Sequence, residues 1–208
     1  MAYANWVKVT PPSGSGDGKV NVSSVTENTG RDYRETKLTW KGANVSNVER
    51  YVRQAGKPEY VDIADSAAAQ KEGADVTIKG ESNSRILTFS LGDTPNGNTE
   101  LLDIDLPNTY TANGVTVNNG SAITGDPGKT SKYEFSITIY VDKNTSIGEK
   151  TRQIIVTNEA GNSDACWLVS AAGDAYVRLD STDPIELGYE AGSSKEIQVY
   201  SNTNWTIE

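Results

Sequence analysis

The two ends of the chain carry the two halves of one repeated sequence unit, in reverse order. Residues 175–208 read as the first half of a β-sandwich repeat, and residues 4–56 read as the second half. One full repeat lies between them. Each terminal half lacks the strands that would complete its sheets and core, so it needs a partner, which is either the other half or a neighbouring copy. The pattern favours assembly over catalysis.

The repeat can be measured by matching short motifs along the chain. Four matches give offsets of 116, 116, 117 and 119 residues: Asn28-Thr29 with Asn144-Thr145, Tyr60-Val61 with Tyr176-Val177, Gln54-Ala-Gly56 with Ala171-Ala-Gly173, and Ser82-Asn83 with Ser201-Asn202. Joining residues 176–208 (33 residues) to residues 1–58 gives 91 residues, the size of an immunoglobulin-like sandwich. We therefore predict a second half-domain at 1–58, a complete domain at 59–175, and a first half-domain at 176–208. The last segment completes 1–58 of the same chain or of a neighbouring one.

Short β-branched runs, separated by Gly, Asn, Asp and Ser clusters, predict strands throughout the chain. The clearest run is 133–141, where Phe135, Ile137 and Ile139 alternate onto one face. Only residues 65–72 have a helical composition, for about two turns at most. The predicted fold class is all-β, with two immunoglobulin-like β-sandwiches, the first of them split between the N- and C-terminal segments. No helix longer than about three turns is expected.

Composition excludes several classes of activity. The 208 residues contain no His and one Cys, which rules out serine–histidine and cysteine–histidine catalysis and His-based metal sites. A glycosidase pair can always be drawn among 28 carboxylates, so it carries no weight. We predict that the protein is not an enzyme, with no catalytic residues, cofactor or metal, and that Cys166 is a buried core residue.

Charge and hydropathy also limit the partners and location. A net charge of −9 without a basic stripe argues against nucleic acid, and no apolar run has the length of a membrane span. The first six residues show no signal peptide, so we expect a protein made in a cytoplasm and kept there or released by lysis. A fragment that had lost its leader would look the same, which leaves a secreted or cell-surface location as the alternative.

The turn signatures resemble those of the BACON family, immunoglobulin-like modules of gut Bacteroidetes and their phages. Across the two ends the resemblance rests on Ser201-Asn202, Trp205, Trp6, Pro11-Pro-Ser-Gly-Ser-Gly16, Asn28-Thr29, Arg34 and Gln54-Ala-Gly56. The middle repeat keeps a thinner set, namely Ser82-Asn83, Gly125-Asp-Pro-Gly128, Asn144-Thr145, Arg152 and Ala172-Gly173. Its tryptophans are lost or replaced, with Ile86 standing where Trp205 does.

The resemblance implies two settings. BACON modules carry a proposed carbohydrate-binding role in secreted enzymes, but for this chain we expect neither a leader nor a catalytic domain, and its repeat is split. The remaining setting is a virion structural protein of a Bacteroidetes-infecting tailed phage, most simply an auxiliary or decoration protein on the capsid, otherwise a head-fibre or tail component. Its partners would be capsid or other virion proteins and copies of itself, with glycans as a further candidate. The alternative is a carbohydrate-binding module of an exported bacterial surface protein or glycan-degrading enzyme.

Two sets of residues are candidates for binding. The middle repeat carries an insertion, 94–99 and 107–128, which is a long loop or an extra hairpin; with the 14–18 tip it is the expected contact surface. The candidate contact residues are Asn96, Asn98, Tyr110, Asn113, Asn118 and Asn119. The candidate residues for docking between the terminal segments are Trp6, Ile197, Val199, Trp205 and Ile207.

Three other motifs have a simpler structural interpretation. Trp6, Trp40, Trp167 and Trp205 could stack on sugars, but each lies in or beside a strand signature and is expected in a core. Asp93, Asp103, Asp105 and Asp126 could bind Ca²⁺, but a solvated acidic face is favoured. The glycine-rich 14–18 stretch lacks the Lys-Ser/Thr of a phosphate loop and is expected to be a turn.

Overall fold

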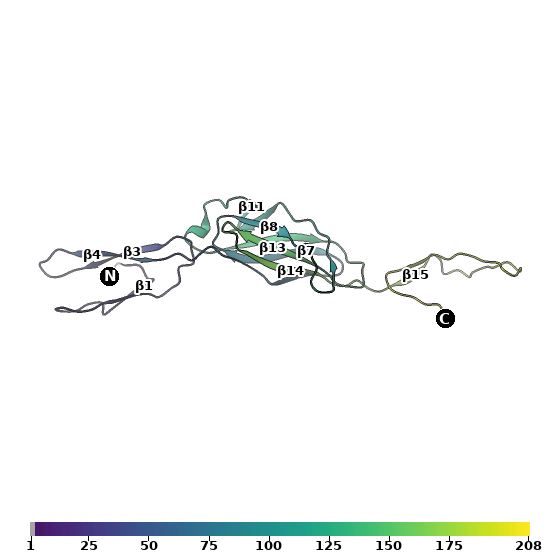
Figure 1. The fold of residues 1–208 in the computed structure, drawn as a ribbon, viewed down its shortest axis with the longest axis horizontal. Coiled ribbons are helices and arrows are strands. Elements are labelled where there is room, and N and C mark those ends of the chain that lie inside the picture. The colour runs from purple at the N-terminus through teal and green to yellow at the C-terminus, as the bar shows by residue number, and fades with distance from the viewer. Residues whose placement is uncertain (1–2) are drawn as a thin grey trace.

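The structure, a computed structural model, describes residues 3–208; residues 1 and 2 of the predicted segment 1–58 lie outside it. The all-β prediction is confirmed, because the described residues form strands β1 to β16 and, as their sole helical element, the 3-10 turn η1 (Pro127–Lys129). Three parts follow one another along the longest axis, as Figure 1 shows. We call them the N-terminal segment (4–58), the central sandwich (59–175) and the C-terminal segment (176–208).

The central sandwich consists of two sheets. One has the order β11-β10-β12-β7-β5, and the other has the order β6-β14-β13-β8, with β9 pairing to β13. The bounds in the first sheet are β5 (Val61–Ile63), β7 (Ala74–Ser82), β10 (Thr109–Ala112), β11 (Val115–Asn118) and β12 (Tyr133–Val141). The bounds in the second are β6 (Ser66–Ala69), β8 (Leu87–Leu91), β9 (Glu100–Leu101), β13 (Lys150–Asn158) and β14 (Ser163–Ser170).

The inner faces of the two sheets form a single core. Strand β12 alternates as predicted, with Phe135, Ile137 and Ile139 all at most 2% exposed. The Phe89 ring from the opposite sheet lies 5.0 Å from the Tyr110 ring and 5.8 Å from the Phe135 ring, centre to centre. These edge and tilted contacts add specific aromatic packing to the area that the two sheets bury.

The helix predicted at 65–72 is wrong. Residues Ser66–Ala69 form β6, which pairs in parallel with β14, and the Ala69 side chain is 2% exposed in the core. A two-turn helix gains few hydrogen bonds for the entropy it costs, whereas the open edge of β14 supplies partners to an extended chain. The segment then turns at Gly73, whose φ of +82° suits a residue without a Cβ.

The insertion at 107–128 contains an extra hairpin, one of the two forms expected. Strands β10 and β11 pair antiparallel around a tight turn at Asn113 and Gly114, with φ of +49° and +76°. An Asn-Gly pair with both residues left-handed matches the twist of a two-residue hairpin. The insertion also adds to the core, because its residues Tyr110, Val117 and Ile123 are buried there.

Each terminal segment contains only hairpins. The N-terminal segment pairs β1 (Val7–Thr10) with β2 (Asn21–Ser24) and β3 (Arg34–Trp40) with β4 (Val48–Gln54). The C-terminal segment pairs β15 (Val177–Leu179) with β16 (Val199–Ser201). The two segments lie at opposite ends of the central sandwich, as Figure 1 shows. Within residues 3–208 there is no helix with the length and apolar character needed to cross a membrane.

Cys166 is fully buried, as predicted. Burial raises the pKa of its thiol to about 11, and the carboxylates of Asp65 and Asp164 add to the shift. The thiolate is the reactive form, and a free cysteine has a pKa near 8.5. We expect Ellman's reagent at pH 8 to react with the native protein on the order of a hundredfold more slowly than with the urea-unfolded protein. Equal rates in the two states would contradict this burial.

Candidate functional site

Asn83 joins the N-terminal segment to the central sandwich. Its side chain is fully buried, and its Oδ1 accepts a hydrogen bond from the backbone N–H of Tyr60 at 3.0 Å. Its Nδ2 donates to the carbonyl oxygens of Lys57 and Pro58, each at 3.2 Å, and of Thr29 at 3.4 Å. A single amide therefore fixes the connecting peptide and holds both parts of the chain.

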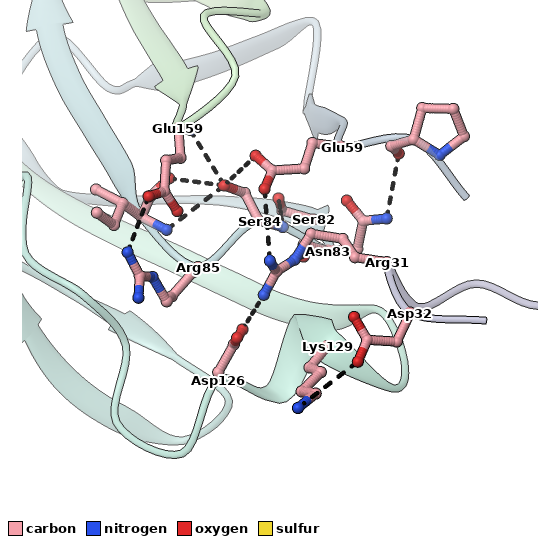
Figure 2. Close-up of polar contacts among 12 residues, drawn as sticks. Arg31, Asp32, Glu59, Ser82, Asn83, Ser84, Arg85, Asp126, Lys129 and Glu159 are labelled. Atoms are coloured by element: carbon pink, nitrogen blue, oxygen red, sulfur yellow. Dashed lines mark hydrogen bonds and ion pairs between the residues drawn. The ribbon is translucent and has the colours of Figure 1, made fainter. Parts of the chain in front are cut away.

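Arg31 reinforces the same junction from the N-terminal segment, as Figure 2 shows. Its Nε donates to the carbonyl oxygen of Asn83 at 2.7 Å. Its guanidinium also pairs with Glu59, at 3.6 Å between Nη1 and Oε1, and with Asp126 on the insertion. The Arg31 side chain is only 20% exposed, so these pairs are partly desolvated and stronger than ordinary surface pairs. The N-terminal segment is thus attached rather than loosely tethered.

Ser84 lies at the centre of the Figure 2 network. Its Oγ lies 3.0 Å from a Glu59 carboxylate oxygen, donates to the Ile86 carbonyl at 3.0 Å, and accepts from the Glu159 N–H at 3.1 Å. Arg85 pairs with Glu159 at 2.9 Å. A hydroxyl beside a carboxylate could suggest a nucleophile, but Ser84 is fully buried and no substrate reaches it. The network is structural.

The same hydrogen bonds recur at the other end of the central sandwich. There, Asn202 accepts from the N–H of Tyr176 at 2.9 Å and donates to the carbonyls of Thr145 at 2.8 Å and Asp174 at 2.9 Å. These four residues match Asn83, Tyr60, Thr29 and Pro58 at offsets of 119, 116, 116 and 116. Beside this junction, and within the central sandwich, Lys71 forms an ion pair with Asp174 at 2.6 Å. The C-terminal segment is therefore held to the central sandwich as the central sandwich is held to the N-terminal segment.

A second asparagine pair repeats as well. Asn28 Nδ2 donates to the carbonyls of Asp32 at 2.8 Å and Ala55 at 3.1 Å. Asn144 lies 116 residues further on (144 − 28). Its Nδ2 donates the equivalent bonds, to the carbonyls of Gly148 at 2.9 Å and Ala171 at 3.0 Å. Ala55 and Ala171 are also 116 apart, so the offset of 117 that the motifs gave for this stretch is one residue too long.

Strand registers extend the match. In the N-terminal segment Arg34 pairs with Gln54, and in the central sandwich Lys150 pairs with Ser170, each residue displaced by 116. The hairpin β3–β4 therefore corresponds to β13–β14. Likewise the β15–β16 pairing of Val177 with Ser201 and Leu179 with Val199 corresponds to the β5–β7 pairing, at offsets of 116 and 119. Each terminal segment reproduces a different part of the central sandwich.

The terminal segments expose apolar side chains that the central sandwich buries. Eighteen of the 22 large apolar side chains exposed among the described residues lie in these two segments. Leu179 is 47% exposed, whereas Ile63, its match in the central sandwich, is 2% exposed. Ile197 is 38% exposed and matches Ile78 at 1%. Each segment therefore presents an open core face, and patches of this kind mark interaction sites.

The N-terminal segment shows the same difference. Trp40 is 40% exposed and corresponds, 116 residues on, to Val156, which is fully buried. Among its described residues, the buried large apolar side chains are those of Trp6, Val7 and Leu38. Arg34 covers the Trp6 ring, with its guanidinium carbon 4.7 Å from the ring centre. The rest of this face is open to a partner.

The two segments also carry opposite charge. Residues 4–58 have nine Lys and Arg against five Asp and Glu, a net charge of +4. Residues 176–208 have two against six, a net charge of −4. The chain's overall charge of −9 hides this asymmetry between its two ends. Opposite charge favours an encounter between the two segments.

The residues predicted on the insertion are not brought together. Asn96 and Asn98 are exposed near the start of β13, where the Asn96 N–H donates to the Thr151 hydroxyl at 2.7 Å. Asn113 is exposed at the hairpin tip, where its N–H donates to the Glu134 carbonyl at 2.9 Å, near the start of β12. These places lie at opposite ends of the central sandwich, because the start of β12 adjoins the N-terminal junction and the start of β13 adjoins the C-terminal one. They do not form one contact surface.

Two of those residues have structural roles instead. Tyr110 is 3% exposed and packs on Phe89, so its prediction as a contact residue is wrong. It faces inward because the hairpin extends the sheet and alternates across it. Asn119 is half-buried, with its Oδ1 and Nδ2 bonded to the N–H and carbonyl of Phe89 at 2.7 and 3.0 Å. Asn118 is exposed at the end of β11.

The residues predicted to dock the terminal segments onto each other range from buried to almost fully exposed. Trp6 is 7% exposed and already packed, Val199 is half-buried, and Ile197, Trp205 and Ile207 are 38%, 47% and 85% exposed. Trp40 is exposed and Trp167 is half-buried, so the expectation that every tryptophan lies in a core is wrong for Trp40 and Trp205.

The acidic candidates do not gather. Asp93, Asp103 and Asp105 are exposed, whereas Asp126 pairs with Arg31. Over residues 3–208 no group of three or more His, Cys, Asp or Glu side chains could hold a metal ion. An open groove of about 770 Å³ between β5, β7, β10 and β12 is lined by charged and polar side chains, among them Asp62, Lys79 and Glu81.

No protein-family model matches the chain, and a search of curated proteins finds no match. The site is therefore defined by its geometry alone. Sequence reasoning located the Ser-Asn and Asn-Thr turns at both junctions but missed Arg31, Glu59 and their partners. The available signal was the repetition of Asn83 at position 202, since a buried amide that recurs at both junctions indicates a shared connection.

Proposed function

We propose that this protein is a structural protein of a virion and acts by protein–protein adhesion. The observation that carries the proposal is the pair of open apolar faces at opposite ends of the molecule, on the N- and C-terminal segments. Such faces are costly in water, at about 25 cal/mol per Å² of apolar surface, and are relieved by association. The described polar network supports the same role, because it holds the three parts of the chain in line.

The resemblance to BACON modules supplies the setting. It supports immunoglobulin-like domains and a tailed phage of Bacteroidetes, where an auxiliary or decoration protein on the capsid fits best and a head-fibre or tail component fits next. The central sandwich is then the one complete immunoglobulin-like domain, and the split domain is formed from residues 1–58 and 176–208. In this proposal the protein works in the virion, without enzymatic activity.

The carbohydrate-binding alternative has weaker support. Trp40 and Trp205 are exposed and could stack on a sugar ring. Both lie, however, on the open faces, and Trp40 corresponds to the buried Val156 of the central sandwich. The groove beside β5 lacks an exposed aromatic platform, because its one aromatic residue, Phe135, is 2% exposed.

Immunogold labelling tests the proposed setting. Antibodies are raised against the 208-residue protein. They are applied to virus particles that are purified by density gradient from lysates of the bacterial culture in which the gene is present. We expect gold on intact particles, at regular positions on the head or tail. Label confined to bacterial cell surfaces, together with binding of the purified protein to a glycan array, would instead establish the carbohydrate-binding alternative.

A further inference from the structure

We infer that the C-terminal segment of one copy completes the N-terminal segment of a second copy, forming a second sandwich with the strand order of the central one. The inference rests on the proposed adhesive function and names its partner: another copy of this chain. It is carried by the correspondence of both segments to different parts of one sandwich. The central sandwich therefore shows how the completed domain is arranged.

The correspondence assigns each pairing. In the central sandwich β6 pairs in parallel with β14, and β8 pairs antiparallel with β13. Adding 116 to β6 gives residues 182–185, and subtracting 116 from β14 gives residues 47–54, so we place 182–185 in parallel with β4. The pair Thr88 and Thr157 becomes Ile207 (88 + 119) and Lys41 (157 − 116), so 206–208 extends along the end of β3.

The first sheet is completed in the same way. Strand β7 pairs along its whole length with β12. Residues 193–201, which include β16, take the place of β7 at an offset of 119. Strand β2 takes the place of β12, because β2 and β12 each run into the repeated asparagine, Asn28 and Asn144 respectively. The open edge of β2 then receives 193–201, which covers Ile197 and Leu179 as Ile78 and Ile63 are covered.

The positions and charges of the two terminal segments indicate that the partner of the N-terminal segment is the C-terminal segment of a second copy. The two segments lie at opposite ends of the central sandwich, so the C-terminal segment faces away from the N-terminal segment of its own chain (Figure 1). Their net charges of −4 and +4 attract across copies. Because the two faces differ, the contact is heterologous and repeats from copy to copy as a line or a closed ring.

Disulfide trapping tests this pairing. The variants Lys41→Cys and Ile207→Cys are made separately, mixed, and oxidised with oxidised glutathione; directly opposed antiparallel residues have the Cα spacing a disulfide needs. We expect a reducible species at twice the 22.4 kDa chain mass from the mixture but not from either variant alone. The buried Cys166 is present in every sample, so a cross-link that formed through it would appear equally in each single variant.

The matched control is the double variant Thr88→Cys/Thr157→Cys, the equivalent pair in the central sandwich, which should cross-link within one chain. If this control forms and the mixture stays at 22.4 kDa, the inference is wrong. An intrachain bond in a Lys41→Cys/Ile207→Cys double variant would also contradict it, since the segments would then close on one chain. Cross-linked copies that never label particles would refute the virion setting while leaving this pairing intact.

Discussion

Replacing Phe135 with alanine is expected to lower the free energy of unfolding of the central sandwich by about 3–5 kcal/mol. The ring is 2% exposed, lies 5.8 Å from the Phe89 ring, and fills the space above Gly80, where an added Cβ would meet it at 2.3 Å. Its removal leaves a cavity between the two sheets that the paired strands cannot close. Urea unfolding followed by tryptophan fluorescence measures the change.

The control for this variant is Tyr140→Ala on the same strand. Tyr140 is 62% exposed and points away from the core, so its loss should change the free energy of unfolding by less than about 0.5 kcal/mol. Equal destabilisation by the two variants would show that β12 does not bury the face assigned to it.

Replacing Asn83 with alanine is expected to be nearly as costly, at roughly 2–4 kcal/mol. The change leaves the N–H of Tyr60 and the carbonyls of Lys57 and Pro58 without their partner in a site where the asparagine itself is fully buried. Unpaired buried polar groups bear their full desolvation cost, and the N-terminal segment loses its main attachment. Urea unfolding and proteolysis near residue 57 measure the two consequences.

Asn202→Ala is the matched control, because Asn202 makes equivalent bonds at the C-terminal junction while it stays half-exposed. Water can replace its bonds, so the isolated chain should lose less than about 1 kcal/mol. The account is contradicted if both variants destabilise the central sandwich equally.

Sequence patterns correctly predicted strands whose apolar residues alternate within a short stretch of chain. The run at 133–141 alternates with period two and forms β12 as expected. The prediction of a helix at residues 65–72 failed because alanine favours helix when the segment is considered alone. In the structure Ser66–Ala69 pairs as a strand with the edge of β14, about 100 residues away in the chain. The prediction of Tyr110 as an exposed contact residue also failed because of pairing between distant residues. The insertion has the composition of a loop, but it extends the sheet and turns this side chain inward.

The candidate site was only partly predictable. Repeated asparagines marked both junctions, because an amide that satisfies several backbone groups recurs wherever the same connection does. Arg31 could not be found in this way, since its partner Asp126 lies 95 residues on and within the insertion. The open apolar faces followed from the split repeat, but their place at opposite ends required the structure.

Light scattering over a concentration series tests the central claim that the two terminal segments complete each other between copies. The account predicts a molar mass that rises with concentration from 22.4 kDa to multiples of it. Leu179→Asp, which places a charge where Ile63 is buried in the central sandwich, should hold the mass at 22.4 kDa, whereas Ile147→Asp on an exposed loop of the central sandwich should not. A mass of 22.4 kDa for the unaltered chain at every concentration would contradict the account.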